Sequence, residues 1–189
     1  GFDAIRAKAF ALLGLVPFVE ARPADDEAIA LRDELAMSLF EAYQAHATSD
    51  WPWWEDIVTY DNAKLCHALM LAGQSMGRPA MIEAGRRALA WLIEIQTAPG
   101  GHLSIIGNQG WYQRGGERAR FDQQPLEAYA LVDACLDAAT ITGEPAWADT
   151  AWWALGWFHG QNDVGMSLHD PETGGCQDGL QAEGPNRNQ

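Results

Sequence analysis

Apolar residues recur at spacings of three and four along much of the chain, which is the period of amphipathic helices. One clear stripe consists of Leu65, Ala68, Leu69 and Ala72. It stops before Gly77, and Pro79 follows shortly after. Glycine at a helix end accepts a positive φ, and proline at a first helical position needs no N–H. The pattern therefore predicts a helix, a tight turn and a second helix.

The same arrangement recurs later in the chain in a single register. Gly77-Arg78-Pro79-Ala80 matches Gly143-Glu144-Pro145-Ala146, and the same register aligns Leu65 with Leu131 and Ala68 with Ala134. A shared register indicates a repeated helical hairpin, the second from about residue 124 to about residue 161. An earlier helix pair is predicted at residues 3–13 and 25–47, joined by a proline-containing bend.

Three long segments follow the hairpins, at residues 48–59, 98–121 and 162–189. Because the helices of a hairpin are antiparallel, these segments should emerge at the same end of the stack. They contain tryptophan, tyrosine and histidine, which favours a functional role over disorder. The sequence thus predicts an all-α fold of consecutive helical hairpins with long loops on one face, in a single domain spanning residues 1–189.

Composition narrows the possible partners. The chain has 26 acidic and 12 basic residues, and its net charge of −14 argues against nucleic-acid binding. The sequence contains no run of 18 apolar residues, so we predict no membrane helix. The three dispersed cysteines fit a reducing, cytoplasmic setting. Neither a close metal-ligand spacing nor a nucleotide-binding glycine motif is present, so we expect no metal and no cofactor.

The long segments place carboxylates beside aromatic rings, a combination that suits sugars. Glycosidic chemistry uses two carboxyl groups, for which Asp61 and Asp122 are the preferred pair. The further catalytic candidates are Glu55, Asp56 and Asp170. The candidates for substrate binding are Trp54, Tyr60, Asn62, His102, Asn108, Trp111, Tyr112, Gln123, Gln124, His169 and Asp178.

Each of these residues also has a structural interpretation. The tryptophans of residues 50–56 could plug the end of the helical stack. Asp61 and Asp122 each precede a predicted helix and could cap it. Both lie in an aromatic–Asp–amide motif, Tyr60-Asp61-Asn62 and Phe121-Asp122-Gln123. Capping needs only the aspartate, so it does not explain the adjoining amides.

Several of these segments together resemble a known family. They are Trp51-Pro52-Trp53-Trp54-Glu55-Asp56, residues 59–63, 107–112, 121–125 and 170–176, and Asp178-Gly179-Leu180. The combination resembles the six-hairpin glycosidase-like (α/α) toroids, and more closely the helical domain of bacterial proteins described as glycosyltransferases. The resemblance implies part of an (α/α) toroid, a saccharide ligand and a glycosyltransferase domain or partner. A closed toroid needs about twice this length, so a fragment is expected.

Three functions follow from these patterns. The first is a carbohydrate-active domain that processes a saccharide in a glycosidase-like cleft. The second is a non-catalytic module that binds glycan or docks beside a glycosyltransferase. The third is a helical-repeat scaffold that binds protein partners through its helix faces. The first two use the long segments, whereas the third does not.

Overall fold

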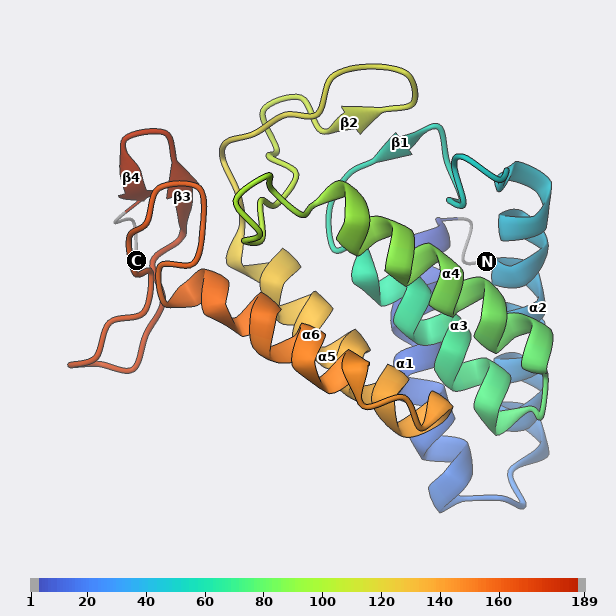
Figure 1. Ribbon diagram of the computed structural model, residues 1–189. Coiled ribbons are helices and arrows are strands. Elements are labelled where there is room, and N and C mark those ends of the chain that lie inside the picture. Colours follow the sequence, from blue (N-terminus) through green and yellow to red (C-terminus); the bar gives the residue numbers. More distant parts are fainter. Residues whose placement is uncertain (1–3, 187–189) are drawn as a thin grey trace.

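The computed structural model describes residues 4–186, and its helices pair into three antiparallel hairpins (Figure 1). The helices are α1 (Ile5–Ala21), α2 (Asp26–His46), α3 (Ala63–Ser75), α4 (Pro79–Ile95), α5 (Pro125–Thr142) and α6 (Ala146–Leu155), followed by the short 3-10 helix η1 (Gly156–Phe158). Helices α1, α3 and α5 pack next to one another, with α3 in the middle. Each is followed by the antiparallel partner of its own hairpin.

The tight turns form where the sequence predicts them. Gly77 has φ 63° and Gly143 has φ 72°, and the Gly143 N–H donates to Ala139 O at 2.9 Å. Pro79 is the first residue of α4. The first hairpin differs from its prediction, because α1 continues through Pro17 to Ala21 instead of ending at residue 13. The apolar face of α1 packs into the core along this whole length. The stabilisation from this packing outweighs the loss of the hydrogen bond that proline removes. Residue 3, the expected start, lies outside the described residues.

Two small antiparallel sheets connect the long segments. Strand β1 (Ile57–Val58) pairs with β2 (Tyr112–Gln113), with Val58 opposite Tyr112. Strand β3 (Gly179–Gln181) pairs with β4 (Gly184–Asn186), and an isolated bridge joins Gln123 to Leu180. In Figure 1 these strands lie at the top and left, away from the short turns at the lower right. The prediction of an all-α fold is therefore wrong, and the chain is a small mixed α/β domain.

The predicted (α/α) toroid is also contradicted. A six-hairpin toroid needs about 12 helices, whereas the described part of this chain has six α-helices. The internal repeat indicates that hairpins stack, and it carries no information on closure. The resemblance to six-hairpin glycosidases and to the helical domain of glycosyltransferases falls with the toroid. The inferences drawn from it, namely carbohydrate metabolism, a glycosyltransferase association and a bacterial source, are withdrawn.

Helix α3 forms the centre of the core, and its residues 63–70 are all buried. Helix α4 approaches it closely at Gly85. A Cβ at Gly85 would lie 2.6 Å from Met70 Cγ and 2.8 Å from Cys66 O, so only glycine fits without displacement. Trp53 and Trp54 cover one end of this core and are 0% and 1% exposed. These tryptophans thus plug the helical stack.

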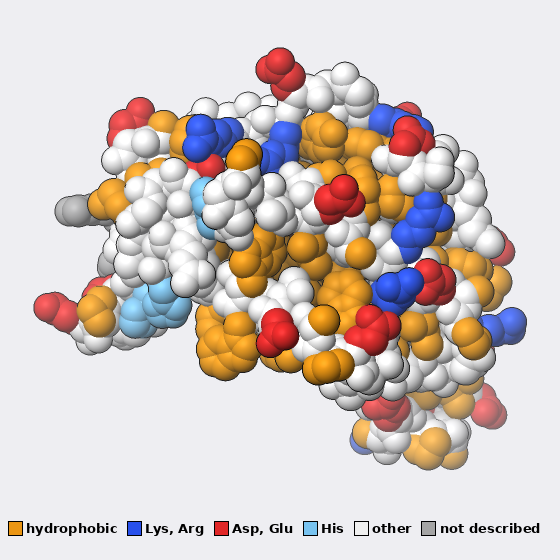
Figure 2. Space-filling view, viewed as in Figure 1, with side chains coloured by type: hydrophobic (Ala, Val, Ile, Leu, Met, Phe, Trp, Pro, Cys, Tyr) orange, Lys and Arg blue, Asp and Glu red, His pale blue; other side chains and the backbone are white. Residues whose placement is uncertain are grey.

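The surface carries side chains of both charge signs, interspersed over the face seen in Figure 2. Hydrophobic side chains gather in the middle of that face, between α4 and α6. On the last hairpin Trp152 is 71% exposed. None of the described helices is both long enough and apolar enough to cross a lipid bilayer.

Candidate functional site

Three residues of the long segments have a backbone conformation that L-amino acids rarely adopt. Asp61, Trp111 and Asp122 have φ values of 49°, 59° and 62°. Within residues 4–186 they are the only non-glycine residues with positive φ. This conformation is strained for a bulky residue such as Trp111 and persists only where surrounding contacts impose it. All three are residues that the sequence singled out.

Neither aspartate caps a helix. The N-cap residue of α3 is Asn62 and that of α5 is Gln124, and no side-chain capping hydrogen bond forms at either helix. Asp61 Oδ1 is buried without a hydrogen-bond partner. Asp122 Oδ1 accepts a hydrogen bond of 2.5 Å from Gln181 Nε2. The capping interpretation therefore does not account for these two carboxyl groups.

The amides that follow the aspartates are structural anchors. Asn62 is fully buried, donates to Thr59 O at 2.9 Å and accepts from Thr59 N at 3.2 Å. Gln123 is also fully buried, and its Oε1 accepts from Trp157 Nε1 at 2.8 Å. Both side chains are inaccessible to a ligand, so their assignment to substrate binding is corrected. Gln124 remains partly exposed.

Glu127 on α5 holds the Tyr60-Asp61-Asn62 turn in place, and sequence reasoning missed it. Its carboxyl accepts hydrogen bonds from the backbone N–H of Asp61, from Asn62 N at 3.2 Å and from Asn62 Nδ2 at 3.0 Å. Burial raises the pKa of Glu127 to about 7, although these N–H donors act in the opposite direction. The register that aligns Gly77 with Gly143 also aligns Asp61 with Glu127, and this is the signal that would have found it.

Arg6 connects the start of α1 to the same turn. Its Nε donates to Tyr60 O at 2.7 Å, and its Nη1 forms an ion pair of 3.0 Å with Glu55 Oε2. The guanidinium carbon lies 4.9 Å from the centre of the Tyr60 ring. The carboxylate of Glu55, a catalytic candidate, is thus paired with Arg6, whose side chain is nearly buried. Burial also raises the pKa of Asp61, against the charges of Lys64 and Arg6.

Two aromatic rings near the aspartates remain accessible. Tyr60 is 47% exposed and Trp111 is half-buried, with 6.4 Å between their ring centres. Trp54, by contrast, is buried and donates from Nε1 to Leu39 O at 2.9 Å. It cannot stack on a ligand, and its assignment to substrate binding is wrong. Tyr112 packs its ring against Trp51 at 5.2 Å.

We call Tyr60, Asp61, Trp111 and Asp122 the loop site. Asn108 N donates to Asp122 O at 3.1 Å, and Trp111 N donates to Gly107 O at 3.1 Å, so these bonds hold the Trp111 segment beside Asp122. The pairing of β1 with β2 joins this segment to the one that holds Tyr60 and Asp61. Asn108 itself is partly exposed beside Asp122. The loop site thus combines two carboxyl groups free of helix capping with the exposed Tyr60 ring and the half-buried Trp111 ring.

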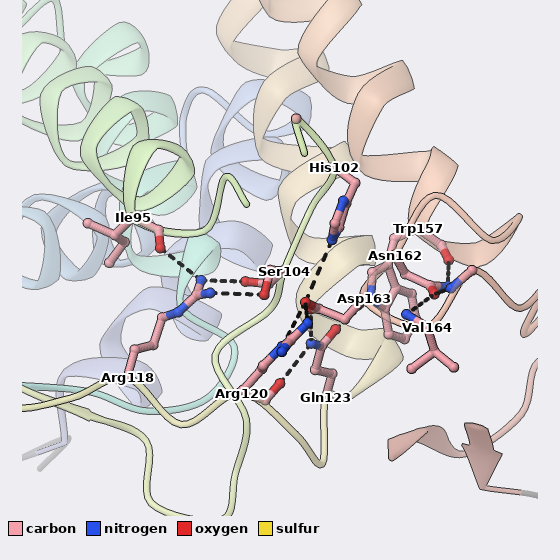
Figure 3. A network of polar contacts seen from close by, with 12 residues as sticks. Ile95, His102, Ser104, Arg118, Arg120, Gln123, Trp157, Asn162, Asp163 and Val164 are labelled. Atoms are coloured by element: carbon pink, nitrogen blue, oxygen red, sulfur yellow. Dashed lines mark hydrogen bonds and ion pairs between the residues drawn. The ribbon is translucent and has the colours of Figure 1, made fainter. Parts of the chain in front are cut away.

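Another predicted residue, His102, belongs to a structural network (Figure 3). Its Nε2 lies 3.6 Å from Oδ1 of Asp163, whose side chain is 2% exposed. Burial acts to raise the pKa of Asp163, but hydrogen bonds from Ser104, Gln123 and Arg120 outweigh it and leave this pKa lowered. The network joins the segment after α4 to the segment after η1 and fixes the position of both.

The remaining candidates have local contacts. Asp56 is exposed, with its Oδ1 3.6 Å from Arg114 Nη1. Asp170 accepts hydrogen bonds from Thr173 Oγ1 at 2.7 Å and from Glu172 N at 2.9 Å, and these bonds lower its pKa. The exposed side chains of His169 and Asp178 have no described contact with the loop site, and the His169 ring lies against His159.

Within residues 4–186 no three histidine, cysteine, aspartate or glutamate side chains form a group that could hold a metal ion. Comparison with protein families found no family whose model matches this chain. Comparison with curated proteins found no matching protein either. Any assignment of function must therefore start from the site itself.

Proposed function

We propose that the loop site binds a saccharide. The observation that carries this proposal is the left-handed conformation of Asp61 and Asp122, two aspartates that cap no helix. Such residues persist only where the surrounding structure imposes their conformation, and they cluster at active sites and ligand-binding sites. The proposal rests on the chemistry of these residues and not on any family resemblance.

The groups of the loop site match the two surfaces of a sugar. Carboxyl oxygens accept hydrogen bonds from sugar hydroxyls, and the side chains of Asp61 and Asp122 are both partly exposed. The faces of Tyr60 and Trp111 suit the C–H surface of a pyranose ring. The chain has a net charge of −14, which disfavours anionic glycans. We therefore expect a neutral oligosaccharide.

A second candidate function is glycoside hydrolysis, and the raised pKa of Asp61 favours it. Burial holds this carboxyl closer to its protonated form, as a general acid requires. In such a reaction Asp61 would protonate the leaving oxygen and Asp122 would act as base or nucleophile. The binding proposal does not depend on this step.

The Asp61→Asn and Asp122→Asn variants are each expected to bind the saccharide about 10-fold more weakly, or about 1.4 kcal/mol. Isothermal titration calorimetry with cellotriose, maltotriose and chitotriose measures this loss. Asp50→Asn is the matched control, because it removes an exposed carboxylate from the same segment. The proposal fails if no trisaccharide binds the parent chain, or if the control loses as much affinity as the two site variants.

Release of reducing ends from the bound trisaccharide separates the two candidate functions. Turnover that Asp61→Asn abolishes while binding persists would assign Asp61 as the acid. Binding without turnover in the parent chain would leave a saccharide-binding module.

A further inference from the structure

The exposed large hydrophobic side chains of the helices lie on the first and the last hairpin. These two hairpins form the edges of the helical stack, because α3 packs between α1 and α5 (Figure 1). The middle hairpin spans residues 63–95, all of which the structure describes, and none of its large hydrophobic side chains is exposed. The exposed ones are Phe10 and Phe18 of α1, Leu31 of α2, Tyr129 and Leu136 of α5, and Trp152 of α6.

The edge formed by α5 and α6, which we call the last edge, contains an apolar groove. Its volume is about 160 Å³, and apolar cavities of about this size hold a benzene ring. Trp152, at 71% exposed, forms part of its wall. The lining is apolar throughout and consists of Val132, Leu136, Ala151, Trp152 and Leu155. The groove therefore has room for one aromatic ring of a neighbouring helix.

The internal repeat indicates that this edge is a stacking surface. In the register of the repeat, Leu136 of α5 corresponds to Met70 of α3, and Tyr129 corresponds to Ala63. Met70 and Ala63 are both 0% exposed, whereas Leu136 is 49% and Tyr129 is 57% exposed. Helix α3 has a helix on each side, and α5 repeats its apolar surface without a second neighbour in the described chain.

The opposite edge of the stack presents an uncharged stripe of α1, which we call the first edge. Its residues fall on one face of the helix and are all exposed: Phe10, Gly14, Pro17, Phe18 and Ala21. The other faces of α1 pack against α2 and α3. The first edge thus offers aromatic rings, and the last edge offers a groove for one.

The helices α1, α3 and α5 run in parallel and begin at the same level. Arg6 near the start of α1 donates from Nη2 to Asn62 Oδ1 at 3.3 Å, and Glu127 near the start of α5 accepts from Asn62 Nδ2 at 3.0 Å. Asn62 is the N-cap residue of α3. Position 6 of α1 is therefore level with position 127 of α5, measured along the helix axes.

A second copy placed against the last edge, with its α1 parallel to α5, is complementary to that edge. Because α-helices share one rise per residue, Phe10 of the second copy is level with position 131, next to Val132 in the groove. Arg22 of the second copy is level with position 143, next to Glu144. Arg22 and Glu144 are both exposed and have opposite charges.

From this match of shape and charge we infer that the chain binds a second copy of itself, with the first edge of one copy stacked on the last edge of the other. Phe10 enters the groove beside Trp152, and Arg22 pairs with Glu144. The contact continues the packing that joins α1 to α3 and α3 to α5. A head-to-tail contact of this kind leaves one edge of each type free, so association continues beyond the dimer unless a ring closes.

Sedimentation velocity over a range of protein concentrations tests this inference. At about 0.15 M salt, which screens the repulsion between chains of net charge −14, we expect the parent to form dimers and larger species as its concentration rises. Phe10→Glu and Trp152→Glu should each remain monomeric, because each places a charge on one edge. Met166→Glu is the matched control, since it adds the same charge at an exposed apolar side chain outside the helices, and it should associate as the parent does.

An equimolar mixture of Phe10→Glu and Trp152→Glu distinguishes this contact from other modes of association. The first variant keeps the last edge and the second keeps the first edge, so the mixture should form a one-to-one dimer and nothing larger. Both substituted side chains are exposed, so both variants should fold, which circular dichroism verifies before mixing. A monomeric parent, a monomeric mixture, or association of either variant alone would overturn the inference.

A charge reversal tests the parallel alignment of the two copies. Arg22→Glu should weaken association several-fold, because it places two carboxylates together at the turn between α5 and α6. Adding Glu144→Arg to the same chain should restore association, since the pair then re-forms with its charges exchanged. Association that stays as weak as in Arg22→Glu alone would contradict the proposed contact.

Discussion

Raising the pH from 4.5 to about 7 is expected to lower the free energy of unfolding by about 3 kcal/mol through Glu127 alone. Burial raises the pKa of this carboxyl from 4.5 to about 7 in the folded chain. In that interval the folded chain keeps a proton that the unfolded chain has lost. The stabilisation is complete below pH 4.5, and it is lost as the pH rises through the folded-state pKa.

Urea unfolding of the parent and of Glu127→Gln between pH 4 and 8 measures this effect. Glutamine keeps the size of the side chain and one acceptor oxygen, but its NH₂ faces an N–H donor of the Asn62 turn. We expect a pH-independent loss of stability in the variant and a flatter pH profile. Other titrating groups cancel in the difference between the two proteins. Parallel profiles would show that Glu127 titrates normally in the folded state.

Local helix signals were sufficient to predict the hairpin turns. Gly77 and Gly143 adopt positive φ because glycine has no steric penalty there, and Pro79 begins α4 because a first-turn residue needs no N–H donor. These effects act within a few residues and leave a direct trace in the sequence. The end of α1 leaves no such trace in the sequence, because the helix continues past Pro17 through packing against elements far along the chain.

Local sequence signals could not test the prediction of a toroid. Closure depends on how many hairpins are present and on the angle between successive hairpins, and neither is encoded in a local repeat. The small sheets were missed for a related reason. Such short strands do not allow a period of two to be recognised, and β1 pairs with a segment that follows only after the whole of the second hairpin.

The sequence singled out two residues of the candidate site, and whether they bind a ligand stays a prediction. Asp61 and Asp122 were chosen because an aromatic–Asp–amide motif precedes two helices, but the structural roles within the motif differ from those expected. The aspartates remain free of capping, while Asn62 and Gln123 are buried anchors. Loop tryptophans show no periodicity, so the direction of the Trp54 side chain could not be predicted.

The ion pairs of Lys64 and His67 with α5 were not predicted, because both residues lie inside the apolar pattern of α3. Polar residues three positions apart on a buried helix need partners on a neighbouring helix. The register of the repeat pairs His67 with Asp133 and so identifies one such partner. A repeat therefore indicates polar contacts between equivalent helices as well as the fold of each hairpin.

The Gly107→Ala variant is expected to lose about 3 kcal/mol of stability and to bind saccharide at the loop site more weakly than either aspartate variant. A Cβ at this position would lie 1.7 Å from Phe121 O and 2.6 Å from Phe121 C. The obstacle is backbone, which no side-chain rotation can relieve. Gly107 must therefore move, and it carries the acceptor for Trp111 N while its own N–H donates to Ala119 O.

Gly14→Ala is the matched control for this substitution, because nothing lies within 4 Å of a Cβ at Gly14 in α1. Removing a glycine from a helix interior should raise stability by about 0.5–1 kcal/mol. Urea unfolding of both variants measures the two opposite changes, and trisaccharide titration reports on the loop site. A Gly107→Ala chain as stable as the parent would contradict the close contact between residues 107 and 121. That contact brings Trp111 and Asp122 together, so the loop site as described requires the predicted loss.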